Sequence, residues 1–251
     1  MNLEGKAVLI TGGRRVGSAL ALMLADRGAS IALTYHTSRE AIERTVAQVE
    51  ARGVRGLAVA ADLADADQAD RAIEQVVATF GRLDVLVNMA SIYKRAPFDS
   101  LTPGDFDAMI AANLAAPYHS AVAAARRMLI QPGEGGIKGK IVNIGDWATE
   151  RPYKDYLPYL IAKGGLTTMT LALARELAPH VTVNMIQPAM IDPPPDLSEE
   201  EIAAVAEIIP LKRIGTPADA NRLILYLLEG TDFATGACYR VDGGRFLGGH
   251  A

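Results

Sequence analysis

Short apolar runs alternate with longer segments of helical periodicity along the whole chain, and this alternation restricts the possible folds more than any other feature. The runs of strand length are residues 7–11, 30–35, 56–61, 84–88, 140–144, 181–186 and 237–241. They are rich in Val, Ile, Leu and Ala and show little polar alternation, which is typical of strands buried on both faces. Repeated β-α-β order predicts a parallel sheet with right-handed crossovers and helices on both faces.

Helical periodicity fills the intervals between these runs. Helices are expected over residues 15–27, 38–52, 65–80, 103–129, 159–177 and, in a short acidic stretch, 198–208. No low-complexity linker or internal repeat divides the 251 residues. We therefore predict a single domain of the α/β class over residues 1–251, a Rossmann-like doubly wound fold with about seven parallel strands. Ligands of such sheets bind beyond the carboxyl ends of the strands, so the residues that follow each strand are the candidates for function.

Residues 189–213 differ in composition from the rest of the chain, because three consecutive prolines begin at Pro193. Consecutive prolines cannot join a helix or a central strand. We interpret this segment as a surface excursion over the site, a substrate loop or lid, with a passive loop as the alternative.

Composition excludes several classes of function. Half of the residues are hydrophobic and 22% are charged, as in a protein with a large core. The net charge of -4 gives no reason to expect nucleic acid, and one cysteine cannot form an internal disulfide. No Cys/His cluster suggests a metal site. Without a signal sequence or an apolar run near the ~18 residues of a membrane span, we expect a cytoplasmic protein.

The first strand leads into the loop TGGRRVG at residues 11–17 and then into a helix. Glycines here allow a tight turn close to a pyrophosphate, while the helix N-terminus supplies N–H donors. A tight turn without a ligand is the alternative. The position of the loop after the first strand of a βαβ series favours a dinucleotide.

The end of the second strand indicates which dinucleotide. An NAD site usually has an acidic residue here, but this chain has Tyr35, His36, Thr37, Ser38 and Arg39. A carboxylate would repel a 2′-phosphate, whereas His36, Ser38 and Arg39 can donate to one, and Arg14 and Arg15 add positive charge nearby. The sequence therefore predicts NADPH. The alternative explanation of the polar residues is a helix cap, with Ser38 as the N-cap.

Three residues after the fifth strand carry the candidate chemistry. Asp146 is followed thirteen residues later (159 − 146) by Tyr159, and Lys163 comes one helical turn after that. A Tyr and a Lys at i and i+4 share a helix face, and a nearby ammonium would lower the pKa of the phenol so that it can exchange protons. A YxxxK pattern alone occurs by chance; its place after the fifth strand makes it informative.

With these residues in register, the sequence resembles the short-chain dehydrogenase/reductase family over essentially its whole length. The matching pieces are residues 11–17, Asp62 with Leu63, residues 88–91, Asn113, Tyr159 with Lys163, residues 184–188 and residues 241–244. The resemblance implies that Asp62 contacts the adenine, that Lys163 binds the nicotinamide ribose and that Tyr159 is the general acid. It also implies that Asn113 holds a water of a proton relay. Taken alone, Asp62 could be a helix cap and Asn113 a solvated helix residue.

Three departures from the family pattern narrow the resemblance. The family normally has Ser at the position of Asp146; a hydroxyl can donate to a carbonyl oxygen, whereas an ionised carboxylate only accepts and would repel the developing oxyanion. A lost catalytic serine in a degenerate member is the alternative. Arg15 stands close to the place of a missing glycine, in a loop that is one residue short. Tyr93 follows Ser91 by two residues, where its ring could cover the nicotinamide pocket or serve only in packing.

These departures resemble the pteridine reductase subgroup of the family. That resemblance implies a pterin between the nicotinamide and Tyr93, with Asp146 and Tyr159 on its amino-pyrimidine edge and Arg15 reaching both the pterin and a cofactor phosphate. The expected reaction is hydride transfer from NADPH to a C=N bond of a dihydropteridine. A carbonyl reductase acting on a 3-oxoacyl thioester, a sugar or a quinone is the alternative, and a non-catalytic NADP-binding sensor or scaffold is a third.

The predicted site follows from the motifs and the resemblance together. The predicted cofactor residues are Gly12, Arg14, Arg15, Val16, Tyr35, His36, Ser38, Arg39, Asp62, Leu63, Asn88, Ala90, Ser91, Lys163, Pro188 and Met190. The predicted substrate residues are Arg15, Ser91, Tyr93, Asp146 and Tyr159, and the predicted catalytic residues are Asp146, Tyr159, Lys163 and Asn113. The resemblance also implies a homotetramer built through the helices around residues 111–125 and 166–177.

Overall fold

The computed structural model describes residues 1–193 and 197–248, which are organised around one seven-stranded sheet of order β3-β2-β1-β4-β5-β6-β7. The strands are β1 (Ala7–Thr11), β2 (Ser30–Tyr35), β3 (Gly56–Ala60), β4 (Val85–Asn88), β5 (Gly139–Ile144), β6 (Val181–Pro188) and β7 (Cys238–Val241). Every neighbouring pair is parallel. The predicted Rossmann-like sheet of seven parallel strands is confirmed.

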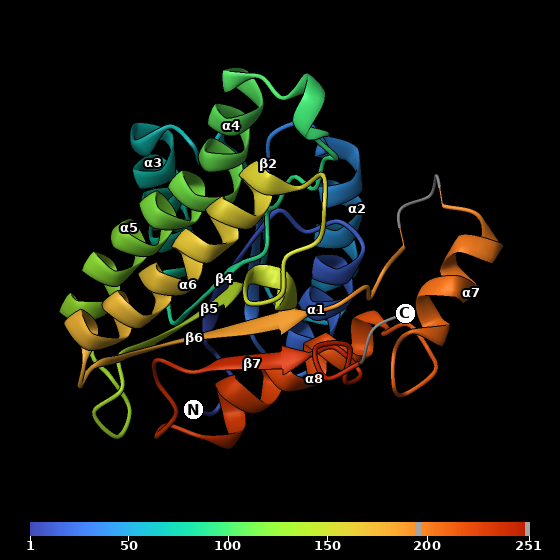
Figure 1. The fold of residues 1–251 in the computed structure, drawn as a ribbon. Helices are drawn as coiled ribbons and strands as arrows, with labels where there is room; N and C mark the ends of the chain where they lie inside the picture. The colour runs from blue at the N-terminus through green and yellow to red at the C-terminus, as the bar shows by residue number, and fades with distance from the viewer. Residues whose placement is uncertain (194–196, 249–251) are drawn as a thin grey trace.

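Helices cover both faces of this sheet (Figure 1). One face carries α1 (Val16–Ala25), α2 (Arg39–Glu50) and α8 (Pro217–Leu225), and the other carries α3 (Ala66–Phe80), α5 (Ala116–Ile130) and α6 (Leu157–Leu177). Successive residues of one strand enter different cores, so that Leu9 packs under α3 and α5 while Val8 and Ile10 pack under α1. The strands are rich in apolar residues because both of their faces are buried, although some polar side chains, such as Asn143 and Asn184, are buried with them.

The region predicted as one helix over residues 103–129 is interrupted. It consists of α4 (Pro103–Ile110), a π-helical turn over Ala111–Ala115, and α5. Thr102 and Asp105 form a reciprocal capping box that starts α4. π-Helical turns are rare and often lie at functional sites, and this one contains Asn113.

The helices α7 and α8 come from the C-terminal part of the chain. The predicted acidic helix is α7 (Glu199–Glu207), which Ser198 and Glu201 begin with a capping box. Helix α8 was not predicted, although Thr216 and Asp219 form the same kind of box at its start. Among the residues that the structure describes, no helix combines the length and hydropathy needed to cross a membrane.

The strand order reverses between β1 and β4, and the loops that follow these two strands lie in close contact. Gly12 has φ +67°, and a Cβ atom added there would lie 2.9 Å from the Cα of Ala90. The backbone N–H of Ala90 donates to Oγ1 of Thr11 at 3.2 Å, and that of Gly12 donates to Oγ1 of Thr34 at 3.1 Å. The ends of β1, β2 and β4 are thus fixed together at the switch point where such sheets bind ligands.

Replacing Gly12 by Ala should therefore destabilise the protein through both backbone strain and a clash. The matched control is Gly53→Ala, because Gly53 also has positive φ (+81°) but no atom within 4 Å of an added Cβ. We expect Gly53→Ala to cost about 1 kcal/mol in unfolding free energy and Gly12→Ala about 1–3 kcal/mol more. Urea denaturation of the cofactor-free proteins measures both, and equal losses would show that the contact with Ala90 is not restrictive.

Candidate active site

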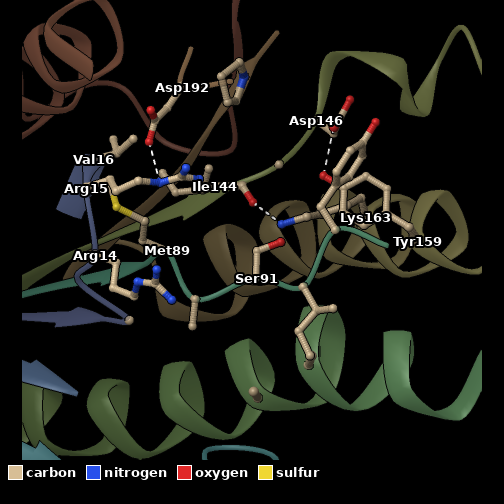
Figure 2. A pocket seen from close by; sticks show the side chains of 18 of the residues that line it. Arg14, Arg15, Val16, Met89, Ser91, Ile144, Asp146, Tyr159, Lys163 and Asp192 are labelled. Atoms are coloured by element: carbon tan, nitrogen blue, oxygen red, sulfur yellow. Dashed lines mark hydrogen bonds and ion pairs between the residues drawn. The ribbon is translucent and has the colours of Figure 1, made fainter. Parts of the chain in front are cut away.

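A cleft of about 1150 Å³ opens at the carboxyl ends of the strands. It brings together most of the predicted site residues, from loops spread along the whole chain (Figure 2). The predicted residues that line it are Gly12, Arg14, Arg15, Val16, Tyr35, His36, Ser38, Asp62, Leu63, Ala90, Ser91, Tyr93, Asp146, Tyr159, Lys163, Pro188 and Met190. Arg39, Asn88 and Asn113 are not among the lining residues.

Asp146 and Tyr159 form a hydrogen-bonded pair on one side of the cleft (Figure 2). The Tyr159 hydroxyl donates to Oδ2 of Asp146 at 2.8 Å, and the backbone N–H of Ala148 donates to Oδ1 at 2.8 Å. Asp146 lies directly after β5, where its carboxylate starts the short 3₁₀ turn Trp147–Thr149, and Tyr159 lies in the first turn of α6. Both side chains are buried. The carboxylate thus accepts from the phenol that carries the candidate general-acid proton.

Burial controls the protonation of this pair. It raises the pKa of Asp146, against the opposing effects of the Ala148 and Tyr159 hydrogen bonds and the Lys163 charge. Burial, and then the charge and hydrogen bond of Asp146, raise the pKa of Tyr159 well above its usual value. Burial therefore makes the ionised form of each group less stable than it is in water.

The expectation that Lys163 lowers the pKa of Tyr159 is wrong for this structure. The Lys163 ammonium donates to the backbone oxygen of Ile144 at 2.8 Å, and its nitrogen lies 5.8 Å from the centroid of the Tyr159 ring. Burial lowers the pKa of Lys163 to about 8. The sequence pattern places Lys163 on the correct helix face, but the charge that directly contacts the phenol is the carboxylate of Asp146.

Asn113 is completely buried below the loop that follows β4. Its Oδ1 accepts from Oγ of Ser91 at 2.6 Å and from the N–H of Ile92 at 3.3 Å, while its Nδ2 donates to the Ile92 oxygen at 3.0 Å. The alternative of a solvated helix residue is therefore wrong. Asn113 holds in place the segment that carries Ser91 and Tyr93; its role with a relay water stays a prediction.

Asn88 is a structural link in the sheet, below the cleft. Its Nδ2 donates to Oδ1 of Asn143 at 2.9 Å and to the Pro117 oxygen at 3.3 Å. These contacts connect β4 to β5 and to α5. The residues of this segment that line the cleft are Met89, Ala90 and Ser91.

An aromatic cluster forms the wall beside the Asp146–Tyr159 pair. Tyr93 stacks on Tyr156, with ring centroids 4.4 Å apart, and meets the Tyr159 ring edge-on at 5.0 Å. Tyr153 and Trp147 also line the cleft. Trp147 belongs to the small apolar cluster around Tyr159 as well, so it is both a wall of the cleft and a packing residue. Sequence reasoning missed Tyr153 and Tyr156, although their closeness to Tyr159 in the sequence was a signal.

At the opposite end of the cleft, the polar residues that follow β2 form part of the lining. Ser38 occupies the N-cap position of α2, as the helix-cap alternative predicts, but its side chain makes no capping hydrogen bond. The guanidinium of Arg39 is turned away and donates to Glu43 at 2.7 Å. Asp62 is not a helix cap, because Asp65 caps α3 through the N–H of Gln68. No carboxylate lies among the cleft-lining residues 34–38.

Arg15 connects the first loop to the segment after β6. Its backbone has positive φ, and its Nε pairs with Oδ2 of Asp192 at 2.5 Å (Figure 2). Sequence reasoning did not single out Asp192. The described part of the 189–213 excursion lines the cleft with Ala189, Met190, Ile191, Asp192, Val205 and Ile209. Pro194, Pro195 and Asp196, within the predicted lid, lie outside the described residues.

Comparisons with known proteins agree with this geometry. The family model described as Enoyl-(Acyl carrier protein) reductase matches residues 13–245. A 3-oxoacyl-[acyl-carrier-protein] reductase of Staphylococcus aureus is 33% identical over 96% of this chain and 98% of its own length. A short-chain dehydrogenase/reductase of Serratia marcescens superposes with a TM-score of 0.89 at 32% identity, covering 98% of this chain and 100% of the other. A blue fluorescent protein from a metagenomic library, solved in complex with NADPH, has a TM-score of 0.87 at 33% identity, covering 98% of this chain and 99% of the other.

A parallel sheet of this order and a Tyr-Lys pair beside a glycine loop define a nucleotide-dependent oxidoreductase fold. The chain belongs to the short-chain dehydrogenase/reductase family, whose members use a nicotinamide cofactor. The residues present fit such a cofactor, because Gly12 leaves no room for a Cβ beside Ala90 and the Ser38 hydroxyl is free of a cap bond.

The raised pKa of Asp146 predicts a pH-dependent stability. A folded-state pKa above the unfolded value of ~3.9 means that the folded state loses stability as pH rises through that interval. Asp146→Asn removes this loss, so its stability relative to the wild type should increase between pH 4 and 7, by about 1.4 kcal/mol per unit of pKa elevation. Thermal denaturation across this pH range measures the difference.

Asp219→Asn is the control of opposite sign. The Arg213 and Thr216 hydrogen bonds lower the pKa of Asp219, so its ionised form stabilises the fold at neutral pH and this effect is lost as pH falls. This variant should therefore be less stable than the wild type at pH 7 and approach it in acid. An Asp146→Asn difference that does not vary with pH would show that Asp146 is not destabilised by burial.

Proposed function

We propose that this protein is an NADPH-dependent reductase that transfers hydride to the C=N bond of a dihydropteridine-type substrate. The observation that carries the proposal is the buried carboxylate of Asp146, hydrogen-bonded to Tyr159 where the family normally has a serine. An ionised carboxylate accepts hydrogen bonds and opposes a developing oxyanion. An amino-pyrimidine edge supplies the N–H donors that such a group needs.

The aromatic wall suits a flat heteroaromatic ring. Tyr93 is half-exposed and is supported from behind by Tyr156, so it offers a positioned ring face to the cleft. Aromatic stacking contributes about 0.5–1.5 kcal/mol beyond the area buried, and a pterin would gain it while its polar edge meets Asp146. Asn113 supports this wall because its side chain accepts hydrogen bonds from Ser91 and Ile92, the two residues before Tyr93.

The bound nicotinamide would supply the hydride, and the chain's own residues would supply the proton. Tyr159 donates its proton to the ring nitrogen of the C=N bond, and the phenolate that remains regains a proton from solvent by way of Asp146, which contacts the phenol oxygen. The Lys163 ammonium donates one N–H to the Ile144 oxygen and has further N–H groups that can donate to a ribose hydroxyl. One hydride and one proton convert the C=N bond to CH–NH.

The preference for NADPH is supported at the end of β2. His36 and Ser38 line the cleft without a carboxylate among residues 34–38, and Arg14 lines it from the first loop, where Arg15 is paired with Asp192. Hydroxyl, imidazole and guanidinium donors suit a 2′-phosphate, which an acidic residue would repel.

Introducing an acidic residue at this position should reverse the preference. We expect Ser38→Asp to weaken NADPH binding at least about tenfold while NADH binding is unchanged or improved. Calorimetric titration with each cofactor measures this, and Ser100→Asp, at an exposed position outside the cleft, controls for added charge. Equal weakening of both cofactors would contradict a 2′-phosphate site at Ser38.

The curated relatives favour a second candidate, a carbonyl reductase acting on a 3-oxoacyl thioester or another ketone. The Staphylococcus aureus relative carries that activity in its name, and the comparisons support this candidate better than the pteridine reductase. The geometry at Asp146 favours the pterin. A non-catalytic NADP-binding role fits less well, because Asp146, Tyr159 and Lys163 converge in one cleft.

Assays with purified protein separate these candidates. NADPH oxidation would be followed with dihydrobiopterin, dihydromonapterin and dihydrofolate, beside a 3-oxoacyl thioester and a simple diketone. We expect turnover of the pterins, with kcat/KM reduced about 100-fold or more in both Asp146→Ser and Tyr159→Phe. Turnover of the ketones alone, kept or improved in Asp146→Ser, would instead establish the carbonyl reductase. No turnover of any substrate would favour the sensor.

We also infer self-association through α5 and α6, as a homotetramer. Tyr118 on α5 and Ile161 and Leu171 on α6 are exposed apolar side chains on the helices for which the family resemblance implies this role.

A further inference from the structure

The wall of the cleft beyond Trp147 contains a cation that the proposed reaction does not use. Arg245, in the turn after β7, lines the cleft together with Trp147, Val205 and Ile209. Its guanidinium carbon lies 5.6 Å from the centroid of the Trp147 ring, and its NH1 donates to the Ile208 oxygen at 3.3 Å. Arg245 is thus held between the C-terminal turn and the end of α7.

Trp147 connects this wall to the reacting end of the cleft. It follows Asp146 directly in the chain and packs in the same apolar cluster as Tyr159. A substrate whose ring lies at Asp146 and whose substituent runs past the indole would therefore bring that substituent to Arg245. The proposed hydride and proton transfers do not involve Arg245.

The charges around Arg245 favour an anion. Arg151 lies beside it and donates through NH1 to the oxygens of Phe246 and Gly248, at 2.6 Å each. Within residues 1–193 and 197–248, neither Arg151 nor Arg245 forms an ion pair, whereas nearby Arg240 pairs with Glu150 at 2.7 Å. Burial, and then the charge of Arg151, lower the pKa of Arg245, yet a guanidinium stays charged at neutral pH.

From this arrangement we propose that Arg245 forms an anion subsite, which selects substrates that carry a carboxylate or phosphate on the substituent remote from the reduced ring. The guanidinium offers free N–H donors in the fork geometry that these groups accept, and Trp147 supports it from one side. The inference rests on the proposed function, because it assumes that the ring to be reduced lies at Asp146.

The first test compares two pterins that differ in the charge of the substituent. Dihydrofolate has two carboxylates in its tail, and dihydrobiopterin has none. We expect Arg245→Gln to lower kcat/KM for dihydrofolate at least about tenfold, mainly through KM, and to change that for dihydrobiopterin less than about twofold. Arg240→Gln is the matched control, since Arg240 lies on β7 nearby but outside the cleft lining.

A second readout needs no turnover. Trp147 is the only tryptophan of the chain, so its fluorescence reports occupancy of the neighbouring wall. Titration of the NADP⁺ complex with p-aminobenzoylglutamate and, separately, with phenyl phosphate distinguishes a carboxylate from a phosphate. We expect at least one probe to change the emission saturably in the wild type and in Arg240→Gln, with a dissociation constant at least about tenfold larger in Arg245→Gln.

Failure of the proposed function and failure of the anion subsite give different results. Probe binding that depends on Arg245, without turnover of any pterin, would overturn the proposed function and leave the anion subsite standing. Pterin turnover with equal effects of Arg245→Gln on dihydrofolate and dihydrobiopterin would overturn the subsite alone, as would the absence of probe binding to the wild type.

Discussion

Burial of the parallel sheet on both faces is the constraint on which the rest of this structure depends. Strand residues such as Val8 and Leu9 enter opposite cores, and the polar side chains that line the cleft follow the ends of the strands. Because all strands are parallel, these ends meet along one edge. The contact of Gly12 with Ala90 fixes that edge at the switch point, where the cleft opens.

Desolvation at the same edge gives Asp146 its chemical character. A carboxylate in water is ionised at neutral pH. Burial raises the pKa of Asp146, and its carboxylate accepts a hydrogen bond from Tyr159. The relatives include a 3-oxoacyl-[acyl-carrier-protein] reductase, and this pair is the feature on which the proposal of a different substrate rests. The aromatic wall of Tyr93 and the cation at Arg245 extend that proposal from the reacting bond to the rest of the ligand.

The segments far from the glycine loop in sequence complete the cleft. Asp192, after β6, pairs with Arg15 of the first loop, and the turn after β7 places Arg245 beside Trp147. Each contact joins residues more than ninety positions apart, since 192 − 15 and 245 − 147 both exceed that separation. Such contacts depend on how the excursion and the C-terminal turn pack, and local patterns carry no information about them.

The sequence by itself determined the parallel sheet, the glycine loop and the order of the family motifs, because strand burial and backbone geometry leave local signatures in apolar runs, glycines and fixed spacings. Only the tertiary structure decided the charge next to the Tyr159 phenol, the free hydroxyl of Ser38 and the burial of Asn113. A residue's pKa and its hydrogen-bond partner depend on desolvation and on neighbours brought from other strands, and these exist only once the chain has folded.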